Sequence, residues 1–377
     1  MHNAQKLEKL EALRGAAAVY VVCHHTIPRD TELLGYKIGL IMSFGQEAVV
    51  TFFLLSGFVI AYSFAQSPNQ TFARYFSRRF SRIYIPLVIV LLLTWLFKSI
   101  EAQRLVNPEL LNLLGNLLML QDLGAEYPGS LLLPYLGNGP LWSLSYEWWF
   151  YLAFFPLAAY VANTRLLHAT AYGIACIAAI AYIFLPIFPL RVLTHFAIWW
   201  TGAYLAYLYI RGHHYKFIPL LLPILALAFI TTLQAINVWW YYRTHGQLPG
   251  LLPHPVGEFR RFAFALFIVL AGLVWLRINA PLYRWLLKPF VCFAPISYGI
   301  YICHDPVMRD ATYLEFINNP ILEWLGYFLI VIGLSVLIEL IIYQRIKHRV
   351  HAITEKLLTP KAPAHLPERN MSTGQHR

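Results

Sequence analysis

Ten apolar segments, each about long enough to cross a lipid bilayer, constrain the fold of this chain more than any other feature. Their approximate bounds are 8–25, 44–65, 83–99, 144–162, 167–186, 192–210, 217–238, 260–277, 287–304 and 320–344. A membrane helix needs about 20 mostly apolar residues. The chain is 59% hydrophobic and only 12% charged, whereas soluble domains carry about 25% charged residues. The sequence therefore predicts an all-α fold, a polytopic membrane helix bundle with about ten transmembrane helices.

One further segment, 105–121, lies between the third and fourth apolar segments and is more polar. On a helix its Glu109, Asn112 and Asn116 fall on one face, with leucines opposite. This pattern is typical of an interfacial or re-entrant helix. The positive-inside rule supports that interpretation, because with ten spans and a cytoplasmic N-terminus most Lys and Arg residues fall in cytoplasmic segments. Both chain termini are then predicted in the cytoplasm.

We predict one transmembrane domain over residues 1–345 and a basic, disordered cytoplasmic tail over 346–377, which is rich in His, Pro and charge. The first apolar segment is expected to be retained, because no small-residue cleavage site follows it. Lys and Arg exceed Asp and Glu by 11, and membrane orientation explains this excess better than nucleic-acid binding does. The four cysteines lie in apolar segments, so no structural disulfide is expected.

Ionisable residues inside apolar segments are costly and therefore informative. Arg14 and His25 are eleven residues apart, so on a helix of 3.6 residues per turn they lie on the same face. Glu147, at the start of the fourth segment, stands among aromatic residues and must pair with a neighbour or change its protonation. Each residue alone also fits a structural role, as a snorkelling arginine, an interfacial histidine or a carboxylate at a helix N-terminus.

Two further polar groupings lie at the ends of apolar segments. Arg78, Arg79 and Arg82 share one helix face, which suits multidentate phosphate binding. Simple anchoring at a cytoplasmic surface is the alternative. The ninth segment ends with Tyr301 and His304, which are neighbours at i, i+3 on a helix. His304 is predicted at the same membrane surface as His25, either in a site or in an interfacial belt of Tyr and His.

The order and spacing of these groupings closely resemble the acyltransferase-3 family of integral-membrane acyltransferases, in its form without a fused extracellular domain. The resemblance covers about residues 7–345. The motifs that carry it are Leu13-Arg14-Gly15 with His25, the run FFLLSGFVI from Phe52 to Ile60, Arg78-Arg79-Phe80-Ser81-Arg82, Trp142-Ser143-Leu144 with Glu147, and Ser297, Tyr298, Tyr301 and His304. Many members carry an acidic residue where this chain has Thr51, and Glu47, one turn earlier, is a candidate to replace it.

This resemblance implies a multi-pass O-acetyltransferase of the bacterial inner membrane, which moves an acyl group, commonly acetyl, from cytoplasmic acyl-CoA to a hydroxyl. The implied acceptors are glycans of the cell envelope or exported glycans, including lipid-linked ones, and neither a metal nor a nucleic-acid partner is implied. The family's catalytic positions map onto Arg14, His25 and Glu147. Its basic RxxR element maps onto Arg79 and Arg82, and with Arg78 these residues are predicted to hold the phosphates of acyl-CoA. Substrate-binding roles are implied for Ser56, Trp142, Tyr301 and His304.

In the mechanism that these roles suggest, neutral His25 is the general base on the acceptor hydroxyl, and Glu147 either orients its imidazole or balances its charge. Arg260 and Arg261, predicted on the outer side, are candidates to contact a lipid diphosphate that carries the acceptor. A secondary transporter of an anionic or acylated solute is the alternative, because buried charges also fit a transport pathway. Against it, the sequence has no paired broken helices of the kind found in transporter repeats. A non-catalytic scaffold leaves the intramembrane charges unexplained.

Overall fold

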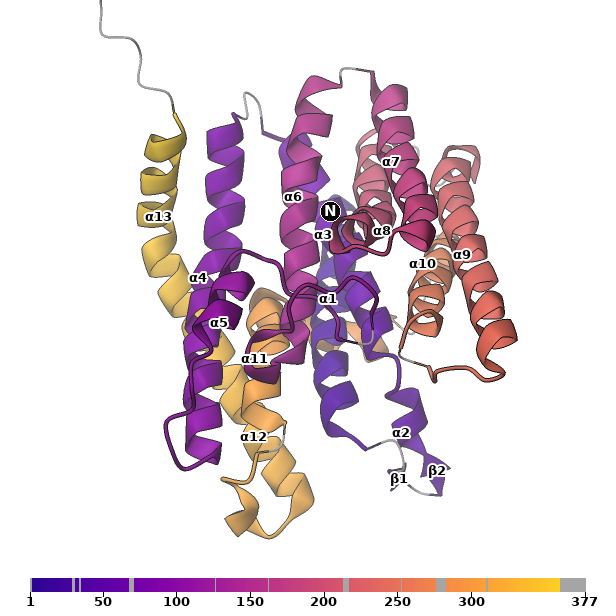
Figure 1. Cartoon of the computed structure of the whole chain (residues 1–377). Coiled ribbons are helices and arrows are strands. Elements are labelled where there is room, and N and C mark those ends of the chain that lie inside the picture. The colour runs from indigo at the N-terminus through magenta and orange to yellow at the C-terminus, as the bar shows by residue number, and fades with distance from the viewer. Residues whose placement is uncertain are drawn as a thin grey trace, which may run out of the picture.

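The computed structural model describes residues 2–28, 31–33, 35–67, 71–125, 127–161, 163–212, 217–251, 253–275, 283–309 and 311–359. Most of these residues belong to helices that pack into a bundle (Figure 1). The strands among them are β1 (Glu32–Leu33) and β2 (Tyr36–Lys37), which form a small antiparallel hairpin. The predicted all-α architecture is therefore confirmed.

The α-helices alternate with short 3₁₀ and π segments along the chain. The α-helices are α1 (His2–Thr26), α2 (Ile38–Ile41), α3 (Gly45–Ala65), α4 (Phe72–Glu101), α5 (Leu110–Leu117), α6 (Trp142–Tyr160), α7 (Thr164–Phe184), α8 (Phe188–Ile210), α9 (Phe217–His245), α10 (Val256–Trp275), α11 (Ser297–Met308), α12 (Pro320–Val336) and α13 (Tyr343–Leu358). The 3₁₀ segments are η1 (Tyr135–Gly137), η2 (Gly139–Leu141), η4 (Lys288–Ile296) and η5 (Glu315–Ile317). The π segments are η3 (Tyr283–Leu287) and η6 (Leu337–Ile342).

Each of the ten predicted apolar segments coincides with a helical stretch of the described structure. Six stretches are long and apolar enough to cross a membrane: α3, α4, α7, α9, Trp285–Met308 and Pro320–Leu358. The other long helices, α1, α6, α8 and α10, carry more polar residues, and the first six residues of α10, for example, include Glu258, Arg260 and Arg261. The structure thus supports a membrane helix bundle, and the number of ten spans stays a prediction.

Only part of the predicted interfacial segment 105–121 is helical, because α5 covers just Leu110–Leu117. Eight residues rise about 12 Å along a helix, too little to cross a bilayer. The buried amide nitrogen of Asn116 donates to the carbonyl of Leu133 at 3.2 Å, and its oxygen accepts from the backbone N–H of Tyr135 at 3.0 Å. The polar face of α5 is therefore satisfied in part by the loop that follows it.

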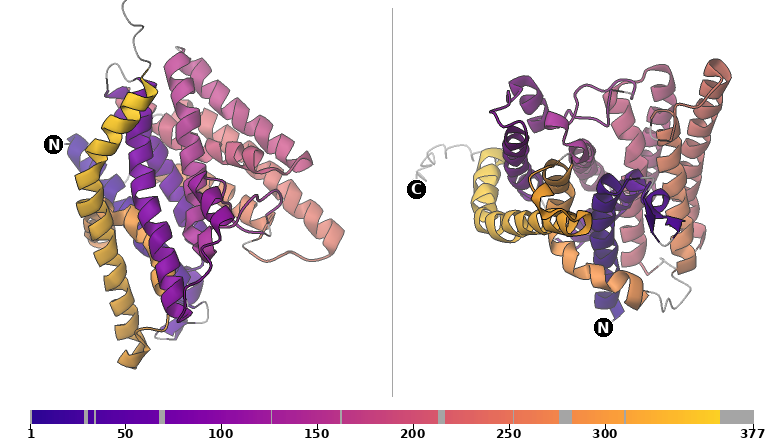
Figure 2. Two further views of the ribbon diagram at one scale, coloured as in Figure 1. Left: turned by 60° about the vertical axis from the view of Figure 1, so that its left-hand side comes forward. Right: turned by 90° about the horizontal axis from the view of Figure 1, so that it is seen from below.

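The C-terminal part of the chain differs from the prediction. α12, η6 and α13 form one helical stretch of 39 residues, Pro320–Leu358, which is about 58 Å long at 1.5 Å per residue. Its last part, α13, lies beside α4 (Figures 1 and 2), with Arg74 Nε 3.7 Å from a Glu355 carboxylate oxygen. The predicted disorder of residues 346–358 is therefore wrong, because these residues continue the helix, whereas the domain boundary at residue 345 stays a prediction. Residues 360–377 of the predicted tail lie outside the described residues.

The close packing of α3 against α8 positions the inner face of the bundle. A Cβ atom added to Gly57 on α3 would lie 2.0 Å from the backbone oxygen of Trp199 on α8, so only glycine allows the helices to approach this closely. The indole rings of Trp199 and Trp200 are fully buried beside this contact. Because α3 is held in this way, Ser56 lies within hydrogen-bond distance of the Trp199 indole, at 3.2 Å.

Candidate active site

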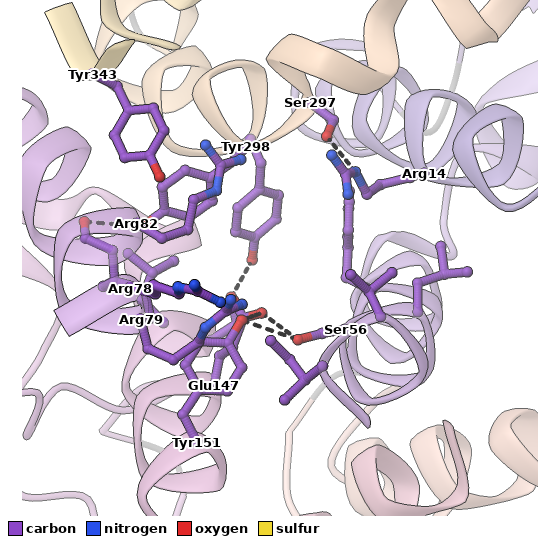
Figure 3. Close-up of a pocket in the computed structure, with 18 of the residues that line it drawn as sticks. Arg14, Ser56, Arg78, Arg79, Arg82, Glu147, Tyr151, Ser297, Tyr298 and Tyr343 are labelled. Atoms are coloured by element: carbon purple, nitrogen blue, oxygen red, sulfur yellow. Dashed lines mark hydrogen bonds between the residues drawn. The ribbon is translucent and has the colours of Figure 1, made fainter. Parts of the chain in front are cut away.

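A cavity of about 550 Å³ lies among α1, α3, α4, α6, α11 and α13, and we call it the arginine cavity. Seven of the residues that the sequence analysis assigned to a site line it: Arg14, Ser56, Arg78, Arg79, Arg82, Glu147 and Tyr301. Figure 3 shows the arginines of α4 on one side of the cavity and Arg14 on the other. Arginine side chains from helices far apart in sequence therefore face one space.

Arg82 is held by a carboxylate that the sequence analysis did not identify. Its guanidinium forms an ion pair and a hydrogen bond with Glu339 of η6. The same guanidinium lies 5.3 Å from the ring centre of Tyr298 and 5.4 Å from that of Tyr343 (Figure 3). Glu339 is buried, and it lies in a π-helical turn, a local distortion that is frequent at functional sites. Arg82 is therefore oriented by its neighbours before any ligand binds.

Arg14 is fixed to the helical segment that precedes and begins α11. Its Nε donates to the Ser297 hydroxyl at 3.1 Å and its terminal nitrogen donates to the Ala294 carbonyl at 3.0 Å. This contact depends on the small residue beside it, because a Cβ on Gly15 would lie 2.0 Å from the Phe290 carbonyl oxygen. The snorkelling alternative thus does not describe Arg14, which points toward protein groups.

Glu147 has partners other than the predicted one. Its carboxylate accepts hydrogen bonds from Ser56 Oγ at 2.6 Å and from the Tyr151 hydroxyl (Figure 3). The guanidinium of Arg79 lies 5.9 Å from the Tyr151 ring centre on the same side. Among the described residues, the carboxylate in contact with His25 belongs to Asp305 instead. The predicted role of Glu147 in orienting His25 therefore has no counterpart in these contacts.

Three side chains, His25, His304 and Asp305, converge near the C-terminal ends of α1 and α11. His25 Nδ1 lies 3.4 Å from Asp305 Oδ1 and 3.3 Å from His304 Nε2. His304 and Asp305 are buried, whereas His25 is partly exposed. We call these three residues the histidine cluster. Their facing atoms lie within 4.8 Å of one another and are of types that can also bind a divalent cation.

The hydrogen bonds of the histidine cluster determine where its protons lie. His304 Nδ1 faces the Ile300 carbonyl at 3.2 Å, so in the neutral ring Nδ1 carries the proton and Nε2 keeps its lone pair. His25 Nδ1 then faces two acceptors, His304 Nε2 and the Asp305 carboxylate. A proton on His25 Nδ1 satisfies both contacts and leaves the lone pair of a neutral His25 on Nε2. This is the form of imidazole that a general base needs.

The arginine cavity and the histidine cluster adjoin each other along α11. Tyr301 lines the cavity, its hydroxyl lies 2.8 Å from Ser143 Oγ, and its ring centre lies 6.3 Å from that of His304. One turn later, Asp305 lines a second, smaller cavity of about 220 Å³. The other residues that line this second cavity are Lys98, Leu136, Gly137 and Arg309. The histidine cluster therefore borders the second cavity through Asp305 and lies next to Tyr301, which lines the arginine cavity.

Several predicted residues lie outside both cavities. Trp142 is buried and packs its ring against Phe53 and Tyr146, and the Arg261 guanidinium lies 5.9 Å from its ring centre. Arg261 is itself fully buried and pairs with Glu258 at 3.0 Å. The proposed contact of Arg261 with a lipid diphosphate therefore does not fit its position.

Arg260 and Glu47 form an ion pair with each other at 2.6 Å. Glu47 is buried, and this pair lies at the N-terminal end of α3, whereas the residues of α3 that line the arginine cavity begin at Phe52. Glu47 therefore does not reach the arginine cavity to stand in for an acidic residue at Thr51. The Arg260 guanidinium is likewise paired with a carboxylate of the protein, and not with a lipid diphosphate.

The functional groups that the sequence analysis missed are Asp305, Glu339 and the α13 residues Lys347, His348 and His351. The predicted ninth segment ended at residue 304, one residue before Asp305. The signal that could have revealed Asp305 is that a carboxylate directly follows the histidine at which the apolar segment ends. A buried ion pair between Asp122 and Arg191, at 3.1 Å, joins a loop to α8. No local sequence motif indicates this pair.

Comparison with known families agrees with this geometry. A family model described as an acyltransferase domain, that of the acyltransferase-3 family, matches residues 7–340, nearly the whole chain. Neither a curated protein nor a solved structure matches the chain. Together with its long apolar helices, this match describes a multi-pass membrane protein. The chain belongs to the acyltransferase-3 family and is a membrane acyltransferase.

Proposed function

We propose that this protein is an acyl-CoA-dependent O-acyltransferase of the bacterial inner membrane that transfers an acyl group, acetyl in the simplest case, to a glycan hydroxyl of the cell envelope or of an exported glycan. One observation carries this proposal: the arginine cavity ends beside the histidine cluster. A polyanionic donor and a general base are thereby neighbours. In the predicted orientation, the C-terminal ends of α3 and α13 face the cytoplasm, where acyl-CoA is available.

The donor site is the arginine cavity. Arg78 and Arg79 line it and form no ion pair within the part of the chain that the structure describes. Guanidinium groups bind phosphate oxygens in pairs and stay charged at every relevant pH, so they suit the diphosphate of CoA. Arg14, on the opposite wall, is positioned to bind the thioester end and to oppose negative charge that develops there.

The chemical step uses His25 as base. His25 Nε2 takes the proton of the acceptor hydroxyl while the hydroxyl oxygen forms a bond to the thioester carbonyl carbon. The carbon–sulfur bond then breaks, CoA leaves as thiolate, and the imidazolium returns the proton to the sulfur. Asp305 stabilises the imidazolium through the 3.4 Å contact with Nδ1, and His304 holds the same tautomer. General-base catalysis of this kind contributes about 10²- to 10⁴-fold.

We infer that the acceptor approaches through the second cavity, which is lined by Asp305 and Gly137 and which faces outward in the predicted orientation. This arrangement lets donor and acceptor reach one base from opposite faces of the membrane. The rest of the rate enhancement comes from positioning two bound substrates in a site with little water.

The test is a turnover assay on the purified protein in lipid nanodiscs. Radiolabelled acetyl-CoA is incubated with candidate glycans, and acceptor-dependent release of CoA is measured together with labelled product. His25→Gln should abolish both, whereas His24→Gln, a change in the neighbouring histidine outside the cluster, should retain most activity. Label that enters proteoliposomes without CoA release would favour the transporter alternative. Full activity of the His25→Gln variant would contradict the proposed mechanism.

A further inference from the structure

The C-terminal helix α13 contributes part of the wall of the arginine cavity, through Tyr343, Lys347, His348 and His351. Three of them continue a series with Glu339, since positions 339, 343, 347 and 351 recur every four residues and share one helix face. We call Tyr343, Lys347, His348 and His351 the α13 face. The proposed donor site so far uses the arginines of α1 and α4, and not Lys347, His348 or His351.

Direct contacts hold the α13 face against α4. His351 Nε2 lies 2.5 Å from the Ser81 hydroxyl. Two cations lie near the Tyr343 ring, with the Arg82 guanidinium 5.4 Å and the Lys347 ammonium 5.6 Å from its centre. Because these contacts join α13 to α4, the Lys347 and His348 side chains lie on the same cavity as the arginines of α4 (Figure 3 shows Tyr343 beside Arg82).

Positive charge that protein carboxylates do not neutralise gathers near the α13 face. Arg82 is paired with Glu339, and Arg14 is hydrogen-bonded to protein oxygens. In contrast, Arg79 has a buried Nε that finds no hydrogen-bond partner among the described residues. Lys347 forms no ion pair with any described residue; its ammonium donates to the Gln344 amide oxygen at 2.5 Å and lies 5.6 Å from the Tyr343 ring centre. This end of the arginine cavity therefore suits a ligand group with strong negative charge.

We propose that the α13 face binds the adenosine 3′-phosphate end of the acyl-CoA donor, an inference that rests on the proposed function. The order of groups along the donor leads to this assignment. The acyl end must lie at the Tyr301 end of the arginine cavity, beside the histidine cluster. The opposite end of the donor carries the 3′-phosphate, and it then reaches the part of the cavity lined by Lys347 and His348.

This inference predicts discrimination between two donors that differ only in that phosphate. The probes are acetyl-CoA and acetyl-dephospho-CoA, which keeps the diphosphate and the thioester. For the wild-type protein, the KM for acetyl-CoA should be about tenfold lower than the KM for acetyl-dephospho-CoA, as expected for one or two charge-assisted hydrogen bonds. In Lys347→Ala/His348→Ala the KM for acetyl-CoA should rise about tenfold, to the dephospho value, while the KM for acetyl-dephospho-CoA and both kcat values stay the same.

The chain offers a matched control on the same helix. Arg345 and Arg349 are exposed, are spaced four residues apart and do not line the arginine cavity. Arg345→Ala/Arg349→Ala removes at least as much positive charge from α13 but leaves the α13 face intact. This control should keep the tenfold preference for acetyl-CoA. A similar loss of preference in the control would show a general effect of charge and would overturn the inference.

Direct binding separates failure of this inference from failure of the proposed function. Calorimetric titration of the purified protein with CoA and with dephospho-CoA needs no acceptor and no turnover. Tighter binding of CoA that disappears in Lys347→Ala/His348→Ala supports the α13 site even when no acceptor is acylated. Equal binding of both ligands to the wild type overturns the α13 site alone, and absence of binding for both overturns the donor assignment as well.

Discussion

The sharpest prediction concerns Asp305, which sequence reasoning did not single out. In Asp305→Asn the residue keeps its size, and its amide oxygen can still accept from the Gly139 N–H, which binds Asp305 Oδ2 at 3.1 Å. The amide nitrogen would then face His25 Nδ1, where the carboxylate oxygen now lies at 3.4 Å. A donor at that place favours the tautomer with the proton on Nε2, which removes the lone pair that the base needs.

The size of the effect follows from the charge that is removed. Two unit charges about 4 Å apart interact by about 4 kcal/mol at an effective dielectric constant of about 20. Arg309 also contacts Asp305, at 3.5 Å, and neutralises part of its charge, so we expect a loss of about 3 kcal/mol in stabilisation of the imidazolium, or roughly a hundredfold in kcat. The tautomer effect adds to this value. The KM for acetyl-CoA should stay unchanged, because Asp305 does not line the arginine cavity.

The assay measures kcat and KM for acetyl-CoA with the acceptor at saturation, and the thermal unfolding temperature of each variant. Asp305→Glu keeps the charge and should recover part of kcat, whereas Arg309→Gln should leave kcat within a few-fold of wild type. Asp305→Asn with a kcat close to wild type would refute the argument that this carboxylate orients His25. A drop in unfolding temperature that also occurs in Asp305→Glu would point to a structural role instead.

Three further predictions concern other contacts. Glu339→Gln should lower the stability of the folded protein by about 2–3 kcal/mol, because it leaves the Arg82 guanidinium without its buried partner, and chemical unfolding in detergent measures the loss. Chelation by EDTA should leave turnover unchanged, whereas added Zn²⁺ should inhibit by binding the histidine cluster, and His304→Gln should weaken that inhibition in a titration of initial rates. Gly57→Val should prevent α3 from packing on α8 and yield aggregated protein in size-exclusion chromatography, while Gly173→Val, at a position with open space around it, should elute as wild type.

Much of the fold was predictable because its causes are local. A run of about 20 apolar residues makes a helix that can enter a membrane, whatever surrounds it. Each of the ten apolar segments therefore overlaps a helical stretch, although α4 begins eleven residues before the predicted start at 83 and the last stretch continues to Leu358. The shared face of Arg78, Arg79 and Arg82 was equally local, since helix geometry alone fixes neighbours at i, i+3 and i+4. All three arginines line one cavity, as that geometry suggested.

The helix over residues 346–358 was missed because a contact with α4, distant in sequence, helps to hold it. Residues 346–358 are polar, and low hydrophobicity is typical of disorder. Yet their charged residues include partners for α4, such as Glu355 for Arg74, and a helix that has already begun is extended at little cost because each added residue gains a hydrogen bond. The contact with α4 is a tertiary property, and no pattern within 346–358 reveals it.

The sequence by itself thus determined the helices, the residues that carry unusual charge inside apolar segments, and the family. Only the tertiary structure decided which charges meet. Asp305, rather than the predicted Glu147, lies beside His25, and Glu339 rather than a phosphate is the first partner of Arg82. These pairs join residues more than 250 positions apart in the chain, so their existence depends on how α1, α4, α11 and η6 pack against one another, which helix periodicity cannot encode.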